Sequence, residues 1–365
     1  MARQQTSELR RGWTTGACAA AAARAAFAAL LTGRFPDPVA IRLPRGEMPR
    51  FALALAEHGH GRARAGIVKD AGDDPDVTHG ALIVAEVAWA VPGAGIAFAA
   101  GEGVGIVTRP GLPLPVGEPA INPAPRAMIR ETLLDLAEAN GAPPPDLTVT
   151  IAIPGGEGLA EKTMNARLGI RGGLSILGTT GIVVPYSCAS WIAAIHRGID
   201  VARAAGLDHI AAATGSTSER AVQQLYALPD HALIDMGDFV GGTLKYLRNH
   251  PVDRLTLAGG FGKMAKLAAG HLDLHSSRSR VEPAALAGVL TEIGGDGEAA
   301  AGAASAAEIL DVAGERRCDL ARYIAARARE VALATLSGDT AVEVAIIDRA
   351  GDLLARVGSR GGREA

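Results

Sequence analysis

A loop in the N-terminal half carries the residue types that proton transfer requires. Residues 69–80 read KDAGDDPDVTHG, with four aspartates and one histidine close together. Crowded carboxylates raise one another's pKa, so that one of them can act as a general acid or base. The alternative is a solvated acidic turn that is capped by its own aspartate side chains. We favour catalysis for this acidic loop and take these residues as candidates: Asp70, Asp73, Asp74, Asp76 and His79.

Two further segments of the N-terminal half have the composition of an anion site. The turn GWTTG at 12–16 opens an alanine-rich helix pattern, and the free N–H groups at a helix start attract carboxylates or phosphates. The glycine-rich run 154–181 contains Lys162, Asn165 and Arg167 but little apolar core, which favours close wrapping around an anionic ligand. The alternatives are a plain helix cap and loose surface loops.

The order of predicted elements changes near residue 190, after which helix and strand patterns alternate. Strand patterns at 209–214, 232–236 and 254–258 each end in glycine and lead into a helix pattern. Such repetition predicts a parallel, doubly wound sheet, whose ligands bind beyond the carboxyl ends of the strands. The three turns supply the candidate cofactor-binding residues: Gly215, Ser216, Gly237, Asp238, Gly259 and Gly260.

His271 and His275, which follow these units, have the spacing that puts two imidazoles on one helical face. The run HLDLH lacks the glutamate of the zinc-protease helix, however, and no helix pattern marks it. Hydrogen-bonded polar residues near a ligand are therefore favoured over a zinc site, and we expect no protein-bound metal.

The elements that must position these residues fall into two fold classes. The N-terminal part reads as mixed α+β, whereas the C-terminal part reads as α/β with a Rossmann-like parallel sheet. We therefore predict an α+β substrate-binding domain over 1–195 and an α/β Rossmann-like domain over 196–365. The principal expected elements outside the three repeated units are a helix at 16–31 capped by Thr15, a strand or helix at 81–91, a helix at 126–139, a strand at 147–153, two helices within 296–335 and a strand at 341–348.

Composition limits the classes of protein to which the chain can belong. With 365 residues and a formal net charge of −3, it lacks the basic excess of a non-specific nucleic-acid binder. Cys18, Cys188 and Cys318 lie far apart, which fits a reducing compartment without a disulfide framework. The polar N-terminus does not resemble a signal peptide, and the apolar run 17–31 is short for a bilayer span. We expect a cytoplasmic protein without nucleic-acid or membrane partners.

Six stretches, in this order, resemble the CbiD family, the cobalt-precorrin-5B C(1)-methyltransferases of cobalamin biosynthesis. The resemblance extends from about residue 9 to about residue 280, and the last 80 residues match only in general character. The stretches are RGWTTGACAAAAA, VKDAGDDPDVTHG, GEGVGIVTRPGL, GEPAINPAPRAMI, IPGGEGLAEKTMNARLGIRGGLSILGTTGIV and GKMAKLAAGHLDLHS.

This resemblance implies that S-adenosylmethionine donates a methyl group to C1 of a corrinoid ring, which converts cobalt-precorrin-5B to cobalt-precorrin-6A. The corrinoid carries its own cobalt, and a carboxylate of the acidic loop would adjust the protonation of the ring. The peripheral carboxylates of the substrate would need cations, hydroxyls and N–H groups. A homo-oligomer is compatible with the sequence. The implied substrate-binding residues are Thr14, Thr15, Gly16, Lys69, Arg126, Lys162, Asn165, Arg167, Thr179 and Thr180.

Two other functions compete with this one. The run GGLSILGTTGIVVP has the composition of phosphate loops in GHMP-type small-molecule kinases, although the chain contains no P-loop GxxxxGK[ST]. A non-catalytic corrinoid-binding protein of the same pathway would use the acidic loop and the glycine loops for binding only. Titration with ATP and S-adenosylmethionine tests the first alternative, and labelled methyl transfer tests the second.

Overall fold

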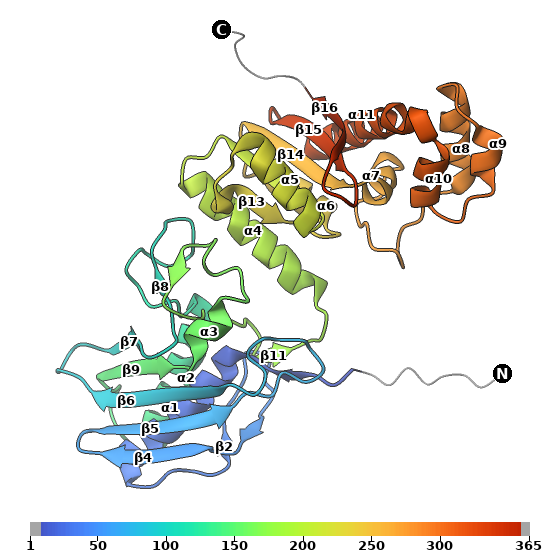
Figure 1. Cartoon of the computed structure of the whole chain (residues 1–365). Coiled ribbons are helices and arrows are strands. Elements are labelled where there is room, and N and C mark those ends of the chain that lie inside the picture. The colour runs from blue at the N-terminus through green and yellow to red at the C-terminus, as the bar shows by residue number, and fades with distance from the viewer. Residues whose placement is uncertain (1–8, 359–365) are drawn as a thin grey trace, which may run out of the picture. The chain divides into compact units, whose positions relative to one another are not determined.

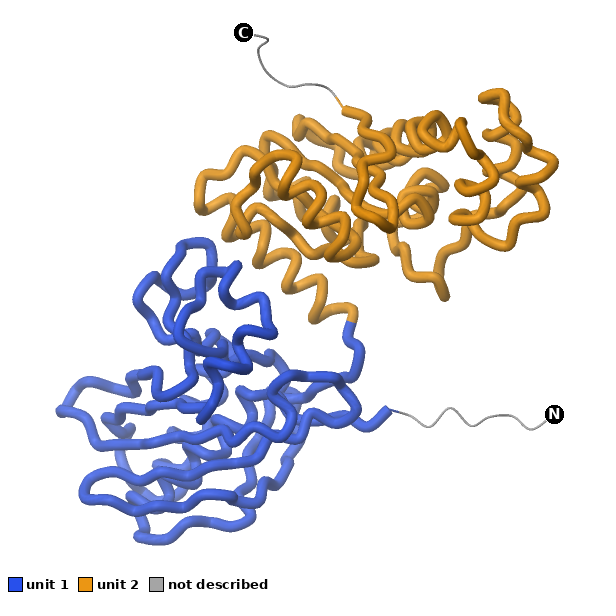
Figure 2. Tube along the Cα trace, viewed as in Figure 1, with its two compact units in different colours: residues 1–187 blue, residues 188–365 orange. Residues whose placement is uncertain are grey.

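The structure, a computed structural model, describes residues 9–358 and divides into two compact units (Figure 2). Unit 1 is Met1–Ser187 and unit 2 is Cys188–Ala365. The boundary expected after residue 195 falls inside helix α4 (Cys188–Ala204), because α4 buries Ile195 and Ile199 in the core of unit 2. The predicted fold classes, α+β and then α/β, are confirmed.

A five-stranded sheet forms the centre of unit 1 (Figure 1). Its order is β4-β5-β6-β9-β7, and β7 with β9 is its one parallel pair. The ambiguous segment 81–91 forms strand β6, in which the alternate residues Ile83, Ala85 and Val87 are buried in the core. The strands are β4 (Leu55–Gly59), β5 (Arg62–Val68), β6 (Leu82–Trp89), β7 (Ile96–Ala100) and β9 (Leu147–Ala152).

Helix α1 (Thr15–Thr32) packs against β5, β6 and helix α2 (Pro123–Ala139). Its alanines permit this close packing, and nearly all its side chains are buried. Thr14, not the expected Thr15, is the N-cap, since its hydroxyl accepts a hydrogen bond from Ala17 N over 3.2 Å. The helix is long and apolar enough to cross a membrane, yet 78% of it is buried in the structure. It is therefore the core helix of unit 1.

Short elements complete unit 1 around this core. The two-residue strands pair antiparallel as β1 with β11, β2 with β3 and β8 with β10. Their bounds, with that of the short helix α3, are β1 (Gly12–Trp13), β2 (Val39–Ala40), β3 (Arg50–Phe51), β8 (Ile106–Val107), α3 (Gly156–Ala160), β10 (Ile170–Arg171) and β11 (Ile182–Val183).

Unit 2 contains a second five-stranded sheet, in the order β13-β12-β14-β15-β16. The first four strands are parallel, as predicted for β12, β13 and β14, and β16 runs antiparallel to β15. Gly259 and Gly260, expected in a turn, are instead the last residues of β14 and pair with β15. The strands are β12 (His209–Ala213), β13 (Leu233–Asp235), β14 (Arg254–Gly260), β15 (Ala341–Ile347) and β16 (Leu353–Gly358).

Helices cover both faces of this sheet. Helix α5 packs on one face through Val222, and α4, α6, α7 and α11 contribute to the larger core on the other. The segment 296–335, expected as two helices, forms α9, α10, a 3-10 turn at Gly314–Arg316 and α11. The remaining bounds are α5 (Ser216–Tyr226), the 3-10 turn Asp230–Ala232, α6 (Val240–Leu247), α7 (Phe261–Ala268), α8 (Pro283–Glu292), α9 (Gly297–Ala301), α10 (Ala306–Val312) and α11 (Arg317–Leu336).

Candidate functional site

Three segments of unit 1 that lie far apart in the sequence are joined by backbone hydrogen bonds. Trp13 N donates to Asp70 O over 2.7 Å, and Thr14 N donates to Gly181 O over 2.9 Å. Close approach requires glycine at Gly12, because a Cβ atom there would lie 2.0 Å from a backbone carbon of the acidic loop. The start of α1, the acidic loop and the loop before β11 therefore form one region of unit 1.

Asp70 is bound by Arg10 through two hydrogen bonds, one of them 2.9 Å long. It also accepts a hydrogen bond from Gly72 N at 2.9 Å. The hydrogen bond from Arg10 is the main cause that lowers the pKa of Asp70 to about 2. The prediction that crowding raises the pKa is therefore wrong for Asp70, which stays ionised near neutral pH.

Asp73 and Asp74 bind backbone N–H groups of two other segments. Asp73 Oδ2 accepts from Arg10 N at 2.6 Å, and Asp74 Oδ1 accepts from Tyr186 N at 2.8 Å. The Asp73 residue is exposed, and its second carboxylate oxygen has no hydrogen-bond partner within residues 9–358. Asp73 thus keeps one oxygen available for proton transfer.

Lys69, expected to bind the substrate, lies inside unit 1 with its side chain only 1% exposed. Its Nζ donates to Thr78 Oγ1 over 2.7 Å and forms an ion pair with Asp76. Burial alone would raise the pKa of Asp76, but the charge and hydrogen bonds of Lys69 outweigh this effect and lower it. Lys69 and Asp76 are therefore a structural ion pair, and Lys69 is unavailable to a substrate carboxylate.

His79 closes the acidic loop with its side chain 53% exposed. Ala71 N donates to His79 Nδ1 over 3.1 Å. Because Nδ1 accepts this hydrogen bond, the neutral ring carries its proton on Nε2. That N–H group can donate to a ligand. Asp74 Oδ2 also has no hydrogen-bond partner within residues 9–358, but Asp74 is half-buried, whereas Asp73 and His79 are exposed.

Arg126 is held by its own unit. Its Nε donates to Ile121 O over 2.7 Å, and Nη2 donates to Glu118 Oε2 over 2.9 Å. The side chain is only 15% exposed, and its guanidinium lies over the ring of Phe98. The carboxylate partner of Arg126 is therefore Glu118, which corrects the expectation of a substrate carboxylate in this structure.

The three other polar candidates of the glycine-rich run differ in their availability. Asn165 is buried, and its Nδ2 donates to Gly173 O over 3.1 Å, so it supports the loop. Arg167 is half-buried and has an interaction within the chain. Lys162 is exposed, and its ammonium group has no partner in the part of the chain that the structure describes. Of the predicted substrate-binding residues in this run, Lys162 is thus the cation that is available to an anion.

The start of α1 does not offer the free N–H groups that an anion would need. Gly16 N donates to Leu177 O over 3.1 Å, and Thr15 and Gly16 are both buried. Thr180 Oγ1 accepts from the backbone of its own loop, whereas Thr179 is exposed and its hydroxyl has no partner within residues 9–358. The prediction that the turn at 12–16 binds an anion is therefore corrected. The turn instead connects α1 to the neighbouring loop through its hydrogen bonds.

In unit 2, the carboxyl ends of β12, β13 and β14 lie side by side. Thr214 N donates to Ala258 O over 2.9 Å, and Met236 N donates to Ala213 O over 3.0 Å. The chain runs from β12 outward to β13 and then returns to β14 on the other side of β12. This reversal is a topological switch point, where open α/β sheets bind their ligands.

Gly215 and Gly260 flank the switch point, at the N-caps of α5 and α7. Their φ angles of 171° and −68° are accessible to any residue. Among the described residues, a Cβ on Gly215 would meet no atom within 4 Å, and one on Gly260 would meet only Ile347 O at 4.0 Å. Neither backbone conformation nor packing requires glycine at these two positions, and the space beside exposed Gly215 and half-buried Gly260 leaves room for a ligand.

The other turn residues are engaged in the fold. Gly237 has a φ of 52°, which favours glycine, and Asp238 forms an ion pair with Lys263. Gly259 is closely packed, since a Cβ there would lie 2.7 Å from Thr214 Oγ1. Ser216 is the first residue of α5. The switch point itself is therefore lined most openly by Gly215 and Gly260.

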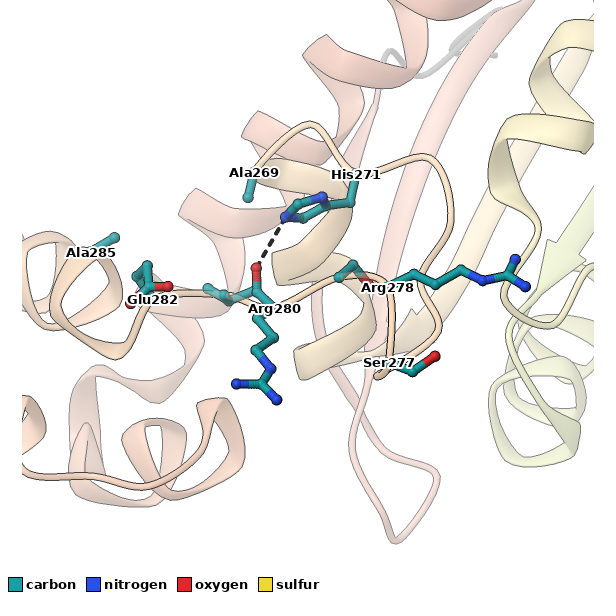
Figure 3. Close-up of a pocket in the computed structure, with 9 residues that line it drawn as sticks. Ala269, His271, Ser277, Arg278, Arg280, Glu282 and Ala285 are labelled. Carbon is teal, nitrogen blue, oxygen red and sulfur yellow. Dashed lines mark hydrogen bonds between the residues drawn. The ribbon is translucent and has the colours of Figure 1, made fainter. Parts of the chain in front are cut away.

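A hollow of about 610 Å³ lies beside the loop after α7 (Figure 3). His271 Nε2 lies 3.0 Å from Arg280 O, and the side chains of Arg278 and Arg280 extend in different directions. His275 Nδ1 lies 2.7 Å from Ser277 Oγ. His271 and His275 lie outside helices, so the one-face argument for zinc fails. Within residues 9–358 no cluster of three or more metal-ligating side chains occurs.

Sequence reasoning missed Trp191, which lies in the first turn of α4. Its Nε1–H donates to Asp235 O over 3.1 Å, at the carboxyl end of β13. The indole is nevertheless 47% exposed. No local motif marks this residue, because its position at the sheet edge depends on the packing of α4 against α6.

Family models match most of the chain. The model described as CbiD matches residues 2–185, and that described as CbiD, C-terminal domain, matches residues 273–358. The match thus extends beyond residue 280, where only a general likeness was expected.

Relatives are similar over nearly the full chain. A cobalt-precorrin-5B C(1)-methyltransferase of Brucella anthropi is 58% identical over 359 residues, which are 97% of each chain. One of Methylorubrum extorquens is 60% identical over 355 residues, or 96% of this chain and 98% of the other. A crystal structure of a cobalamin biosynthesis protein (cbiD) from Archaeoglobus fulgidus is 29% identical, with a TM-score of 0.40, and covers 74% of this chain and 83% of that one.

Proposed function

This chain belongs to the CbiD family, and on that premise we propose that it methylates C1 of cobalt-precorrin-5B to give cobalt-precorrin-6A. It is a methyltransferase of cobalamin biosynthesis, as are the relatives that share 58% and 60% of its residues. Its substrate is a corrinoid that brings its own cobalt. Cytoplasmic location and a homo-oligomeric state stay predictions.

Unit 2 binds the methyl donor, and the openness of Gly215 and Gly260 is the observation that carries this assignment. Gly215 follows β12 and Gly260 ends β14, so both lie beside the switch point, where a ligand can approach the backbone without meeting a side chain. The N–H groups that begin α5 lie beside Gly215. S-adenosylmethionine supplies there, when bound, the sulfonium methyl group that the ring carbon takes.

Unit 1 binds the corrinoid in this proposal. Lys162 offers an ammonium group, and Thr179 offers a hydroxyl, each without a partner in the described part of unit 1. These groups suit the peripheral carboxylates of the substrate, since a charged hydrogen bond contributes about 1.5–3 kcal/mol. Lys69, Arg126 and Asn165 act indirectly, because they hold the loops that carry the exposed groups.

Asp73 and His79 are the residues we assign to proton transfer. Asp73 has one oxygen available, and the Nε2–H of His79 is exposed. Asp70, Asp74 and Asp76 hold Arg10, Tyr186 and Lys69 in place instead. A carboxylate and an imidazole can together accept and return a proton as the charge on the ring changes.

The kinase alternative is not favoured by the local structure. The run that resembles a phosphate loop does not open a helix within unit 1 but ends in β11, which pairs with β1. A phosphate loop needs free N–H groups at the start of a helix. The non-catalytic alternative is not favoured either, because the full-length relatives are named as methyltransferases.

Titration of the full chain with S-adenosylhomocysteine tests the donor site. Gly215→Ala and Gly260→Ala should each weaken binding about tenfold, which corresponds to about 1.4 kcal/mol, and leave the melting temperature unchanged. Gly288→Ala is the control, because a Cβ at this position in α8 also meets no atom within 4 Å among the described residues. Equal affinity in all variants would show that the donor does not bind at this end of the sheet. Binding of ATP in place of S-adenosylhomocysteine would favour the kinase.

A further inference from the structure

Trp191 is an exposed aromatic side chain whose orientation is set by the fold. Its Nε1–H donates to Asp235 O over 3.1 Å, and its ring packs on Gly237, where a Cβ would lie 3.4 Å from the indole. The neighbouring residue Ile192 packs against Gly242 in α6, which fixes this turn of α4. The indole therefore has a defined position at the carboxyl end of β13.

The same ring is 47% exposed. Phe239 lies 6.5 Å away between ring centroids and is tilted by 50°, so it does not stack on the indole. A tryptophan that is anchored by its N–H group and left open on the rest of its surface resembles the stacking platforms that bind planar heteroaromatic rings.

The position of the ring relates it to the donor site. β13 is the direct neighbour of β12, and Asp235 pairs in register with Ala213, two residues before Gly215. Trp191 thus lies at the carboxyl end of the sheet, as the switch point does, and on the β13 side of the switch point. If the amino-acid chain of the methyl donor lies beside Gly215, its adenine ring extends along the carboxyl ends of the strands toward β13.

We propose that Trp191 is the stacking platform for the adenine ring of the methyl donor. The inference rests on the proposed donor site of unit 2 and adds the residue that recognises the base. The N–H group of the indole is already bound to Asp235 O, so recognition uses the face of the ring and not its polar edge. Trp191 is a binding residue in this proposal and takes no part in proton transfer.

Tryptophan fluorescence reports on this contact directly. The chain has three tryptophans, so the variant Trp13→Phe/Trp89→Phe keeps Trp191 alone. S-adenosylhomocysteine should quench its emission in a saturable manner, with the dissociation constant measured by calorimetry. S-ribosylhomocysteine, which lacks the base, should leave the emission unchanged.

Affinity provides the second readout. Trp191→Ala should raise the dissociation constant of S-adenosylhomocysteine about 10- to 100-fold, as expected for loss of one base stack. Trp191→Phe, which keeps an aromatic face, should raise it only a few-fold. Trp89→Ala is the matched control, because Trp89 is 48% exposed but belongs to unit 1. The affinity for S-ribosylhomocysteine should be the same with and without the indole.

The outcomes separate this inference from the function on which it rests. If the wild-type chain binds S-adenosylhomocysteine but Trp191→Ala binds it equally well and the fluorescence does not change, the stacking role is refuted and the donor site stands. If the wild-type chain does not bind it at all, both are refuted. If Trp191→Ala changes only the oligomeric state, the indole covers a protein surface and the stacking role is again refuted.

Discussion

Asp73 and Asp74 each bind one backbone N–H group through one carboxylate oxygen, but Asp73 is exposed whereas Asp74 is half-buried. One oxygen of Asp73 accepts from Arg10 N at 2.6 Å, and the other is available within the described part of the chain. Asp73→Asn keeps an oxygen that can accept the hydrogen bond from Arg10 but removes the charge and the basicity. We expect turnover to fall by about 100-fold or more, the usual contribution of a general acid or base, with an unchanged melting temperature.

Steady-state kinetics and thermal unfolding check this expectation together. Glu131→Gln, an exposed carboxylate on α2, is the control and should behave as the wild type. Turnover near the wild-type value in Asp73→Asn would assign the whole acidic loop to structure.

For Lys69 we expect a substitution to affect the stability of the fold, whereas for Asp73 we expect an effect on turnover. Lys69→Met leaves Asp76 without its ion-pair partner in a half-buried position and should lower the free energy of unfolding by about 3–5 kcal/mol. The double variant Lys69→Met/Asp76→Asn should recover part of this loss, because it leaves no unpaired charge. Additive losses in the double variant would contradict the ion pair.

The same pair has a predictable pH dependence. The pKa of Asp76 is lowered in the folded chain. Its ion pair therefore stabilises the fold fully at a pH above 3.8, the ordinary pKa of an aspartate. That stabilisation is lost as the pH falls through the folded-state pKa. The stability difference between the wild type and Asp76→Asn should therefore be full at neutral pH and shrink below about pH 4.

These residues also show how far the sequence can predict the site. The spacing within 69–80 correctly grouped Lys69 with the aspartates, because those residues are neighbours along the chain. It could not show that Arg10 and Tyr186 bind Asp70, Asp73 and Asp74, because these partners come from segments 60 or more positions away. Contacts at such separation depend on the fold and not on local pattern.

At the scale of elements, the cap of α1 depends on a long-range contact. The extended backbone of Thr14, with φ −72° and ψ 158°, places its hydroxyl over Ala17 N, and its own N–H is held by Gly181 O. Two adjacent threonines are equivalent as caps in the sequence. The strand pairing of β1 with β11 selects Thr14, which explains why Thr15 was the wrong prediction.

Thr14→Ala removes the cap and should lower the free energy of unfolding by about 1 kcal/mol, whereas Thr14→Ser should keep most of it. Chemical denaturation of the full chain, followed by far-ultraviolet circular dichroism, measures the difference. Equal losses in both variants would show that the methyl group, which packs near Gly178, matters more than the hydroxyl.

Elements with a strong repeating pattern were predictable for a physical reason. The strands and helices of the parallel sheet in unit 2 bury continuous apolar segments between glycine turns, and their bounds match the expectation closely. Helix α1 was predictable from its alanines and Gly33. The segment 81–91 was ambiguous, because a buried strand and a buried helix have similar composition, and only pairing with β5 and β9 decides it.

At the scale of the whole molecule, we propose that the two units share one reaction. Unit 1 offers the exposed cation Lys162 and the residues that we propose for proton transfer, and unit 2 offers an open backbone at the switch point of a parallel sheet. Neither glycine openness nor the exposure of Trp191 could be read from the sequence, because both depend on what surrounds them.

Transfer of a labelled methyl group tests the central claim most directly. The purified full chain is incubated with cobalt-precorrin-5B and S-adenosylmethionine labelled in its methyl carbon, and nuclear magnetic resonance locates the label in the product. The account predicts one labelled methyl group at C1 and one equivalent of S-adenosylhomocysteine. Label at another ring position would contradict this prediction. So would the recovery of unchanged cobalt-precorrin-5B from a chain that binds both cobalt-precorrin-5B and S-adenosylmethionine.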